Sequence, residues 1–189
     1  MQFQSDFLWQ YVEHWAKQIP DAPSIRDESR SYNWREFNLL TDNLATTFLN
    51  IGIRKGDIIA TMLPASIEYL FALIAADKIG AIVCALDVKY KTADLRKFIS
   101  HLNPKLVISL GKQDDFDIAG SLRAIEKDLG LTGSIDYLLV GEPDHEDDFQ
   151  PSLNGISSLN NDLALAKQHQ KRDDGMLIVF TGGTTGIPK

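Results

Sequence analysis

The chain has 189 residues, of which 44% are hydrophobic and 24% are charged, and its formal net charge is −7. This length and composition predict a folded globular protein with a sizeable core, and they exclude the collagen, coiled-coil and disordered classes. The acidic balance also argues against a nucleic-acid binder, because phosphate backbones are held by clustered lysine and arginine, and no such cluster occurs here.

Neither the N-terminus nor the most apolar segment predicts contact with a membrane. The first twenty residues carry several charges and lack the basic leader and unbroken apolar stretch of a signal peptide. Residues 69–86 are apolar but are interrupted by Asp77 and Lys78, so they are not expected to span a bilayer. The single cysteine, Cys84, lies in an apolar run and is expected to be a buried small side chain. We therefore expect no transmembrane segment and a cytoplasmic location.

The first helix is predicted over residues 5–19. Its apolar residues recur at helical spacing, and Ser5 or Asp6 is a natural N-cap. Pro20 then stops the helix, because proline lacks the backbone donor that a further turn would need. Residues 22–32 are expected to form a short extended pair.

A second helix is predicted over residues 33–51. Asn33 can cap its N-terminus, and Glu36 completes the pattern of a capping box three residues later. Gly52 ends the helix, because glycine readily takes the left-handed conformation common just beyond a helix C-terminus.

From residue 57 onward, strand and helix patterns alternate strictly. Strands are expected at 57–63, 81–86, 105–110 and 135–140, with helices at 66–80, 92–103 and 117–130 between them. Thr92 is the expected N-cap of the middle helix, and a short helix at 158–168 precedes a last strand at 173–180. Consecutive apolar residues in strands are typical of sheets covered on both faces, and helical crossovers enforce parallel strands. The predicted fold class is α/β, with a doubly wound, mostly parallel sheet flanked by helices.

Several chemically suggestive residues are interpreted as structural. The stretch 141–157 is rich in acidic residues, proline and glycine, and it predicts a solvated surface loop, because the ligand spacing of an EF-hand is missing. The histidines lack partners at catalytic spacing and are expected at the surface: His14, His101, His145 and His169. The tryptophans lie on helical faces and are expected to serve packing: Trp9, Trp15 and Trp34. No metal site is predicted.

The most informative segment is residues 176–189, "MLIVFTGGTTGIPK", an apolar strand followed by a loop of glycines and threonines. The glycines allow positive φ, so the backbone amides can turn inward, and the threonine hydroxyls add donors. Lys189 supplies a compact positive charge that suits polyphosphate oxygens. The candidate phosphate-binding residues are Thr181, Gly182, Gly183, Thr184, Thr185, Gly186 and Lys189.

This loop differs from the Walker A pattern. Ile187 and Pro188 separate Gly186 from Lys189, and Pro188 removes a backbone donor where a Walker helix would begin. A P-loop NTPase is therefore disfavoured. A glycine- and threonine-rich hairpin without a ligand is the structural alternative.

The segment 180–189, "FTGGTTGIPK", resembles the signature phosphate loop of the adenylate-forming superfamily: acyl-CoA synthetases, luciferases and the adenylation domains of peptide synthetases. Residues 31–48, "SYNWREFNLLTDNLATTF", and residues 52–90 resemble two earlier blocks of that family, in the same order. The sequence departs from the usual loop at Gly182, where many members have serine.

The resemblance implies that the whole protein joins a carboxylic acid to coenzyme A through an acyl-adenylate, using ATP and Mg²⁺. It implies that residues 1–189 are a truncated N-terminal part of the large AMP-binding domain, with the acid pocket, the magnesium ligand and the catalytic lysine downstream. The loop would then grip the ATP phosphates, with Lys189 as counter-charge, and the fragment alone would be inactive.

Three functional hypotheses follow. A fatty acyl-CoA synthetase is favoured by "TGGTTG" and by the block that begins at Gly52. An adenylation domain serving a carrier protein keeps the chemistry but changes the thiol, and Asp87 favours that pattern slightly. A stand-alone, non-catalytic α/β binding module is the third. A sheet without its later strands also predicts an exposed apolar edge, and therefore a homodimer of the fragment.

Overall fold

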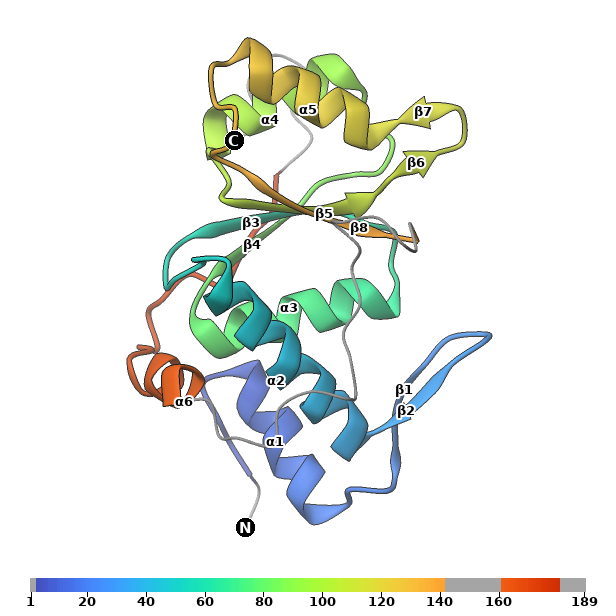
Figure 1. Cartoon of the computed structure of the whole chain (residues 1–189). Helices are drawn as coiled ribbons and strands as arrows, with labels where there is room; N and C mark the ends of the chain where they lie inside the picture. Colours follow the sequence, from blue (N-terminus) through green and yellow to red (C-terminus); the bar gives the residue numbers. More distant parts are fainter. Residues whose placement is uncertain (1–2, 142–160, 181–189) are drawn as a thin grey trace. The chain divides into compact units, whose positions relative to one another are not determined.

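The computed structural model describes residues 3–141 and 161–180 (Figure 1). The chain forms two compact units, and both are discontinuous in sequence. The first comprises Met1–Gly56, Ala65–Ala81 and Pro151–Met176, and the second comprises Asp57–Pro64, Ile82–Gln150 and Leu177–Lys189. Within the described ranges, no helix is both long enough and apolar enough to cross a membrane.

The described residues of the first unit form four helices and a β-hairpin. The helices are α1 (Leu8–Gln18), α2 (Trp34–Asn50), α3 (Ile67–Ile79) and α6 (Asn161–Gln168), and the antiparallel hairpin pairs β1 (Pro23–Arg26) with β2 (Ser31–Asn33). The predicted capping box of α2 is confirmed: Asn33 Oδ1 accepts from the Glu36 amide at 2.8 Å, and Glu36 Oε2 accepts from the Asn33 amide at 2.9 Å. Such a cap contributes about 1 kcal/mol to helix stability.

The cap of α1 differs from the sequence prediction. Neither Ser5 nor Asp6 caps this helix, because the chain enters it at Phe7, whose side chain makes no capping bond. Instead, Asp77 on α3 accepts a hydrogen bond from the Trp9 amide at 2.9 Å. Local sequence could not reveal this cap, because its acceptor lies 68 residues downstream.

The second unit contains a five-stranded sheet in which every pair is parallel. Its order is β8-β5-β3-β4-β9, formed by β3 (Ile58–Met62), β4 (Ile82–Ala85), β5 (Leu106–Leu110), β8 (Asp136–Val140) and β9 (Leu177–Ile178). The chain passes from β3 to β4 and then returns to the other side of β3 to form β5. Helices α4 (Thr92–Leu102) and α5 (Ile118–Asp128) pack together over one face of this sheet (Figure 1). The predicted α/β class, with a parallel sheet flanked by helices, is confirmed.

The core of the second unit lies between the sheet and these two helices. Alternate strand residues such as Ala60, Met62 and Cys84 meet the apolar faces of α4 and α5. Cys84 has no exposed surface, and burial raises the pKa of its thiol to about 11. The prediction that Cys84 is a buried small side chain is therefore confirmed.

Two local features of this unit differ from the sequence prediction. Thr92 is the first residue of α4 and not its N-cap, a position that Lys91 takes without a side-chain bond. The predicted alternation of strands and helices also did not include a hairpin that lies between β5 and α5. In this hairpin β6 (Lys112–Gln113) pairs with β7 (Phe116–Asp117). Its strands are too short to produce a recognisable period-two pattern. Asp117 then caps α5 by accepting from the Gly120 amide at 2.8 Å.

β9 forms an apolar edge of the sheet. Leu177 is 39% exposed and Val179 is 67% exposed, and no strand among the described residues pairs with the outer side of β9. Because such edges pair with other chains, we expect residues 1–189 to self-associate when produced alone. Replacing Val179 by lysine is expected to shift the population toward monomer in size-exclusion chromatography with light scattering.

The matched control is Leu165→Lys, which places the same charge at an exposed apolar position on α6. This variant should associate as the wild type does. A wild-type chain that stays monomeric at high concentration would contradict the prediction.

Candidate functional site

The predicted phosphate loop, residues 181–189, lies outside the described residues. The roles of its members therefore stay predictions: Thr181, Gly182, Gly183, Thr184, Thr185, Gly186 and Lys189. The structure does fix the point at which the chain leaves the sheet to begin this loop.

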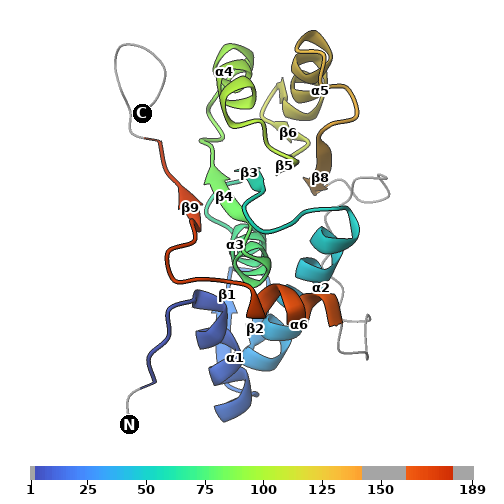
Figure 2. The same ribbon diagram turned by 90° about the vertical axis from the view of Figure 1, so that its left-hand side faces the viewer.

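The loop begins at the carboxyl edge of the parallel sheet. β9 runs parallel to β4, with Leu177 opposite Val83 and Ile178 opposite Cys84, and Figure 2 shows the two strands side by side. The carboxyl ends of β4 and β9 therefore point the same way. Open α/β sheets bind their ligands outside these ends, because the loops gather there and leave a crevice. The candidate loop thus starts at the edge from which such sheets bind ligands.

Phe180, the residue before the loop, packs against the core. It is the last described residue before Thr181, and it is half-buried among the core residues beneath α4. Its ring centroid lies 4.7 Å from that of Phe98. The loop therefore leaves the sheet from a fixed point.

The segment before β9 is held by side-chain contacts within the first unit. Trp9 Nε1 donates to Gln170 Oε1 at 2.8 Å, and the Gln170 amide group donates to the Asp77 carbonyl. Lys55 Nζ contacts the carbonyl oxygen of His169 at 2.8 Å. These bonds fix the chain a few residues before it enters the strand that carries the loop.

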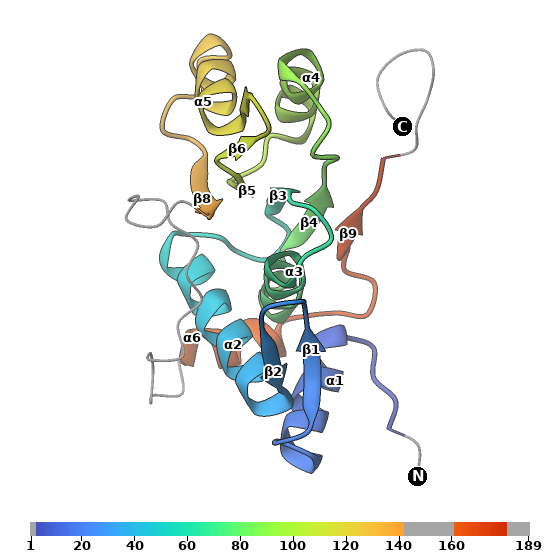
Figure 3. The same cartoon turned by 90° about the vertical axis from the view of Figure 1, so that its right-hand side faces the viewer.

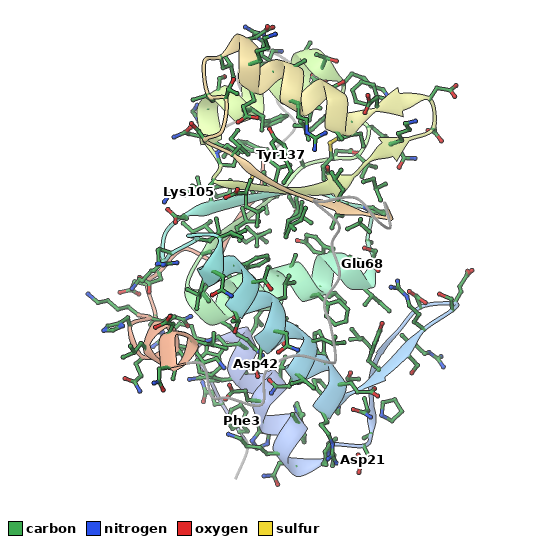
Figure 4. The ribbon with its side chains drawn as sticks, in the orientation of Figure 1. Phe3, Asp21, Asp42, Glu68, Lys105 and Tyr137 are labelled. Carbon is green, nitrogen blue, oxygen red and sulfur yellow. The ribbon has the colours of Figure 1, made fainter. Side chains whose placement is uncertain are left out.

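A buried charge cluster joins α2, α3 and α6 in the first unit. Lys78 has no exposed surface, and its Nζ donates to Asp42 Oδ1 at 2.9 Å and to Thr41 Oγ1 at 2.7 Å. Lys167 on α6 donates to the same Asp42 oxygen at 3.0 Å and to Glu13 Oε1 at 2.7 Å. Figure 4 labels Asp42 on α2. Sequence reasoning missed this cluster, although Lys78, a lysine inside the apolar run 69–86, is a signal that could have indicated one.

The pKa values in this cluster follow from burial and charge. Burial lowers the pKa of Lys78 to about 8, while the Asp42 carboxylate opposes this change and Lys167 adds to it. Burial favours a higher pKa for Asp42, but the ammonium groups of Lys78 and Lys167 outweigh it, so the pKa lies below its usual value. A lysine with a lowered pKa is a candidate nucleophile. The Lys78 ammonium group is enclosed by protein acceptors to which it donates, however, which indicates a structural role.

The histidines and tryptophans that the sequence analysis interpreted as non-catalytic can be compared with the structure where they are described. His101 and His169 are exposed, as predicted, while His14 is half-buried and stacks on Phe3 with ring centroids 4.0 Å apart. Trp9 is buried and Trp34 is half-buried, as expected for packing, whereas Trp15 is 38% exposed. His145 and residues 142–157 of the acidic stretch lie outside the described residues. Among residues 3–141 and 161–180, no three histidine, cysteine, aspartate or glutamate side chains come together as a metal site.

Residues 12–189 match the family model described as "AMP-binding enzyme". Because the match covers nearly the whole chain, the chain belongs to the AMP-binding enzyme family, the adenylate-forming superfamily. The family resemblance deduced from the sequence motifs is thereby confirmed.

Curated proteins with different names are about a quarter identical to the chain over almost its full length. The chain is 25% identical to tyrocidine synthase 1 of Brevibacillus parabrevis over 186 residues, which are 98% of this chain and 15% of that protein. It is 26% identical to a 4-coumarate-CoA ligase of Humulus lupulus over 184 residues, which are 96% of this chain and 32% of that protein. The chain therefore spans about a third or less of the length of these relatives.

Solved structures share the fold. The protein VinN superposes with a TM-score of 0.70 at 17% identity, covering 100% of this chain and 43% of VinN. A fatty acyl CoA synthetase of Mycobacterium tuberculosis superposes with a TM-score of 0.67 at 18% identity, covering 97% of this chain and 33% of that enzyme. These likenesses show that the chain has the fold of the N-terminal region of such enzymes.

Proposed function

We propose that the chain is the N-terminal part of an AMP-forming ligase that joins a carboxylic acid, in the favoured case a fatty acid, to coenzyme A. The observation that carries the proposal is the segment "TGGTTGIPK", which follows β9 at the carboxyl edge of the sheet in a member of the AMP-binding family. A cytoplasmic location, where ATP and coenzyme A are available, is part of the proposal.

The proposed reaction has two steps. A carboxylate oxygen attacks the α-phosphorus of ATP, so that an acyl-adenylate forms and pyrophosphate leaves. The thiol of coenzyme A then attacks the acyl carbon, and AMP leaves. Because negative charge shifts onto the departing pyrophosphate, positioned donors and cations supply much of the acceleration.

The donor set of the loop fits a polyphosphate. Hydroxyls of Thr181, Thr184 and Thr185, with the amides of the glycines, would donate to the β- and γ-phosphate oxygens, and Lys189 would balance their charge. The loop holds no carboxylate, so we do not assign Mg²⁺ to it. Mg²⁺, coenzyme A and the acid are assigned to the protein that continues beyond these residues.

A second candidate is an adenylation domain that delivers its acyl group to a carrier protein. The 25% identity with tyrocidine synthase 1 over 98% of the chain favours it. This candidate shares the first step and differs in the thiol that accepts the acyl group. A stand-alone α/β binding module would perform neither step.

ATP–pyrophosphate exchange tests the proposal. The complete reading frame is expected to catalyse exchange that depends on an added fatty acid, whereas residues 1–189 alone are expected to catalyse none. A mixture without acid is the control. Supplying coenzyme A or a carrier protein in a second assay then identifies the thiol. If the complete protein catalyses no exchange with fatty, aromatic or amino acids, the ligase proposal fails.

A further inference from the structure

A row of three aromatic rings connects the segment after β4 to the start of the phosphate loop. The ring of Tyr90 stacks on that of Phe98, with centroids 4.8 Å apart and planes inclined by 21°. Phe98 in turn contacts Phe180 at 4.7 Å with an inclination of 53°. The rings come from three parts of the chain that are distant in sequence, and the row ends one residue before Thr181.

Backbone pairing holds only a short part of β9 in the sheet. β9 pairs with β4 through two residues, Leu177 and Ile178 (Figure 3). Phe180 lies two residues beyond the last paired residue, so its position depends on the contacts of its side chain. Those contacts are made on the inner face of the strand, since Val179 is largely exposed on the other face.

The other two rings are firmly held. Phe98 is 3% exposed and lies on the buried face of α4 beside Leu95 and Ile99. Tyr90 is fixed by a turn in which its amide donates to the Asp87 carbonyl at 3.0 Å. Phe98 and Tyr90 are therefore held by their own surroundings, and the contact with Phe98 in turn fixes the ring of Phe180.

We infer that Phe98 is a positioning residue for the phosphate loop: its ring fixes Phe180, the last described residue before the loop. This inference rests on the proposed function, because it requires that the loop bind the phosphates of ATP. A loop that follows a firmly held residue loses less freedom when it binds a polyphosphate, so binding is tighter. Phe98 acts through Phe180 and has no contact with the substrate in this account.

A double-mutant cycle tests the inference in the complete protein. Aromatic pairs contribute about two- to tenfold to an equilibrium constant. Phe98→Leu and Phe180→Leu are each expected to raise the KM for ATP in pyrophosphate exchange by about that factor, with the KM for the acid unchanged. If Phe98 acts through Phe180, the double variant should be no worse than the more impaired single variant.

Phe48→Leu is the matched control. Phe48 is fully buried on α2 in the first unit, so the change removes a similar volume from a core without touching the aromatic row. This variant is expected to keep the wild-type KM for ATP. Should Phe98→Leu fold poorly, Tyr90→Leu removes the half-buried outer ring and is expected to raise the KM for ATP by a smaller factor.

The possible outcomes separate the two proposals. A wild-type KM for ATP in Phe98→Leu, or additive effects in the cycle, would overturn the positioning role and leave the ligase function standing. The same holds if Phe48→Leu raises the KM for ATP as much as Phe98→Leu does. Absence of exchange in the wild-type protein would overturn both, since no bound phosphate would then need positioning.

Discussion

Replacing Lys189 by alanine in the complete protein is expected to slow acyl-adenylate formation by about 10²- to 10³-fold, the loss typical when one preorganised charge-stabilising group is removed. The ammonium group would balance the charge that develops on the departing pyrophosphate, whereas water in its place would have to reorient at a cost in free energy. The measurement is ATP–pyrophosphate exchange at saturating ATP. Saturation matters because it separates a slower chemical step from weaker ATP binding.

Two further variants make this experiment specific. Lys189→Arg keeps the charge but changes its shape and reach, so it should recover part of the lost rate. Lys97→Ala removes an exposed lysine on α4 and should leave the rate unchanged. Unchanged turnover of Lys189→Ala at saturating ATP would exclude the proposed role of Lys189.

Replacing Asp42 by asparagine is expected to lower the free energy of unfolding by about 3–5 kcal/mol, because removing one partner of a buried ion pair leaves an uncompensated charge. In this protein the effect falls on Lys78, which is fully buried, and on Lys167, which shares the same oxygen. Urea denaturation followed by tryptophan fluorescence measures the change. A loss below about 1 kcal/mol would mean that the cluster is no stronger than a surface pair.

An exposed pair and the pH dependence serve as controls. Asp128→Asn removes the carboxylate that pairs with Arg96 at 3.0 Å on the surface, and should cost at most about 1 kcal/mol. Because the pKa of Lys78 is about 8 in the folded protein and 10.5 in the reference state, the unfolded chain binds more protons between these values. The contribution of Lys78 to the free energy of unfolding should therefore rise with pH through that window, and the difference in stability between the wild type and Lys78→Met measures it. Lys78→Met should remove that rise.

The elements that local chemistry specifies were predicted well from the sequence. The capping box of Asn33 and Glu36, the apolar strands and Gly52 just beyond the end of α2 each depend on residues close together in the chain. The phosphate loop was proposed from the same kind of signal, since its glycines, threonines and lysine are contiguous. Such features are visible because one short segment contains all of their parts.

The features that the sequence did not reveal are contacts between distant segments. The cap of α1 is supplied by Asp77, the partners of Lys78 lie on α2, and Phe98 meets Phe180 across 82 positions of chain. Hydrophobic periodicity in the sequence cannot predict such pairs, because it indicates which face of a helix or strand is buried but not which segment covers that face. The edge position of β9 beside β4 could not be predicted for the same reason.

The bonds of Trp9 also have a consequence for the order in which the first unit folds. Its amide is bonded to a residue 68 positions away, and its indole to Gln170, 161 positions away. At about 5–20 residues per second, synthesis of the intervening chain takes roughly 8–30 seconds. During that interval the indole of Trp9 lacks its Gln170 partner, because α1 is synthesised well before that residue. The first unit therefore completes its contacts only after the segment that leads into the phosphate loop has been synthesised.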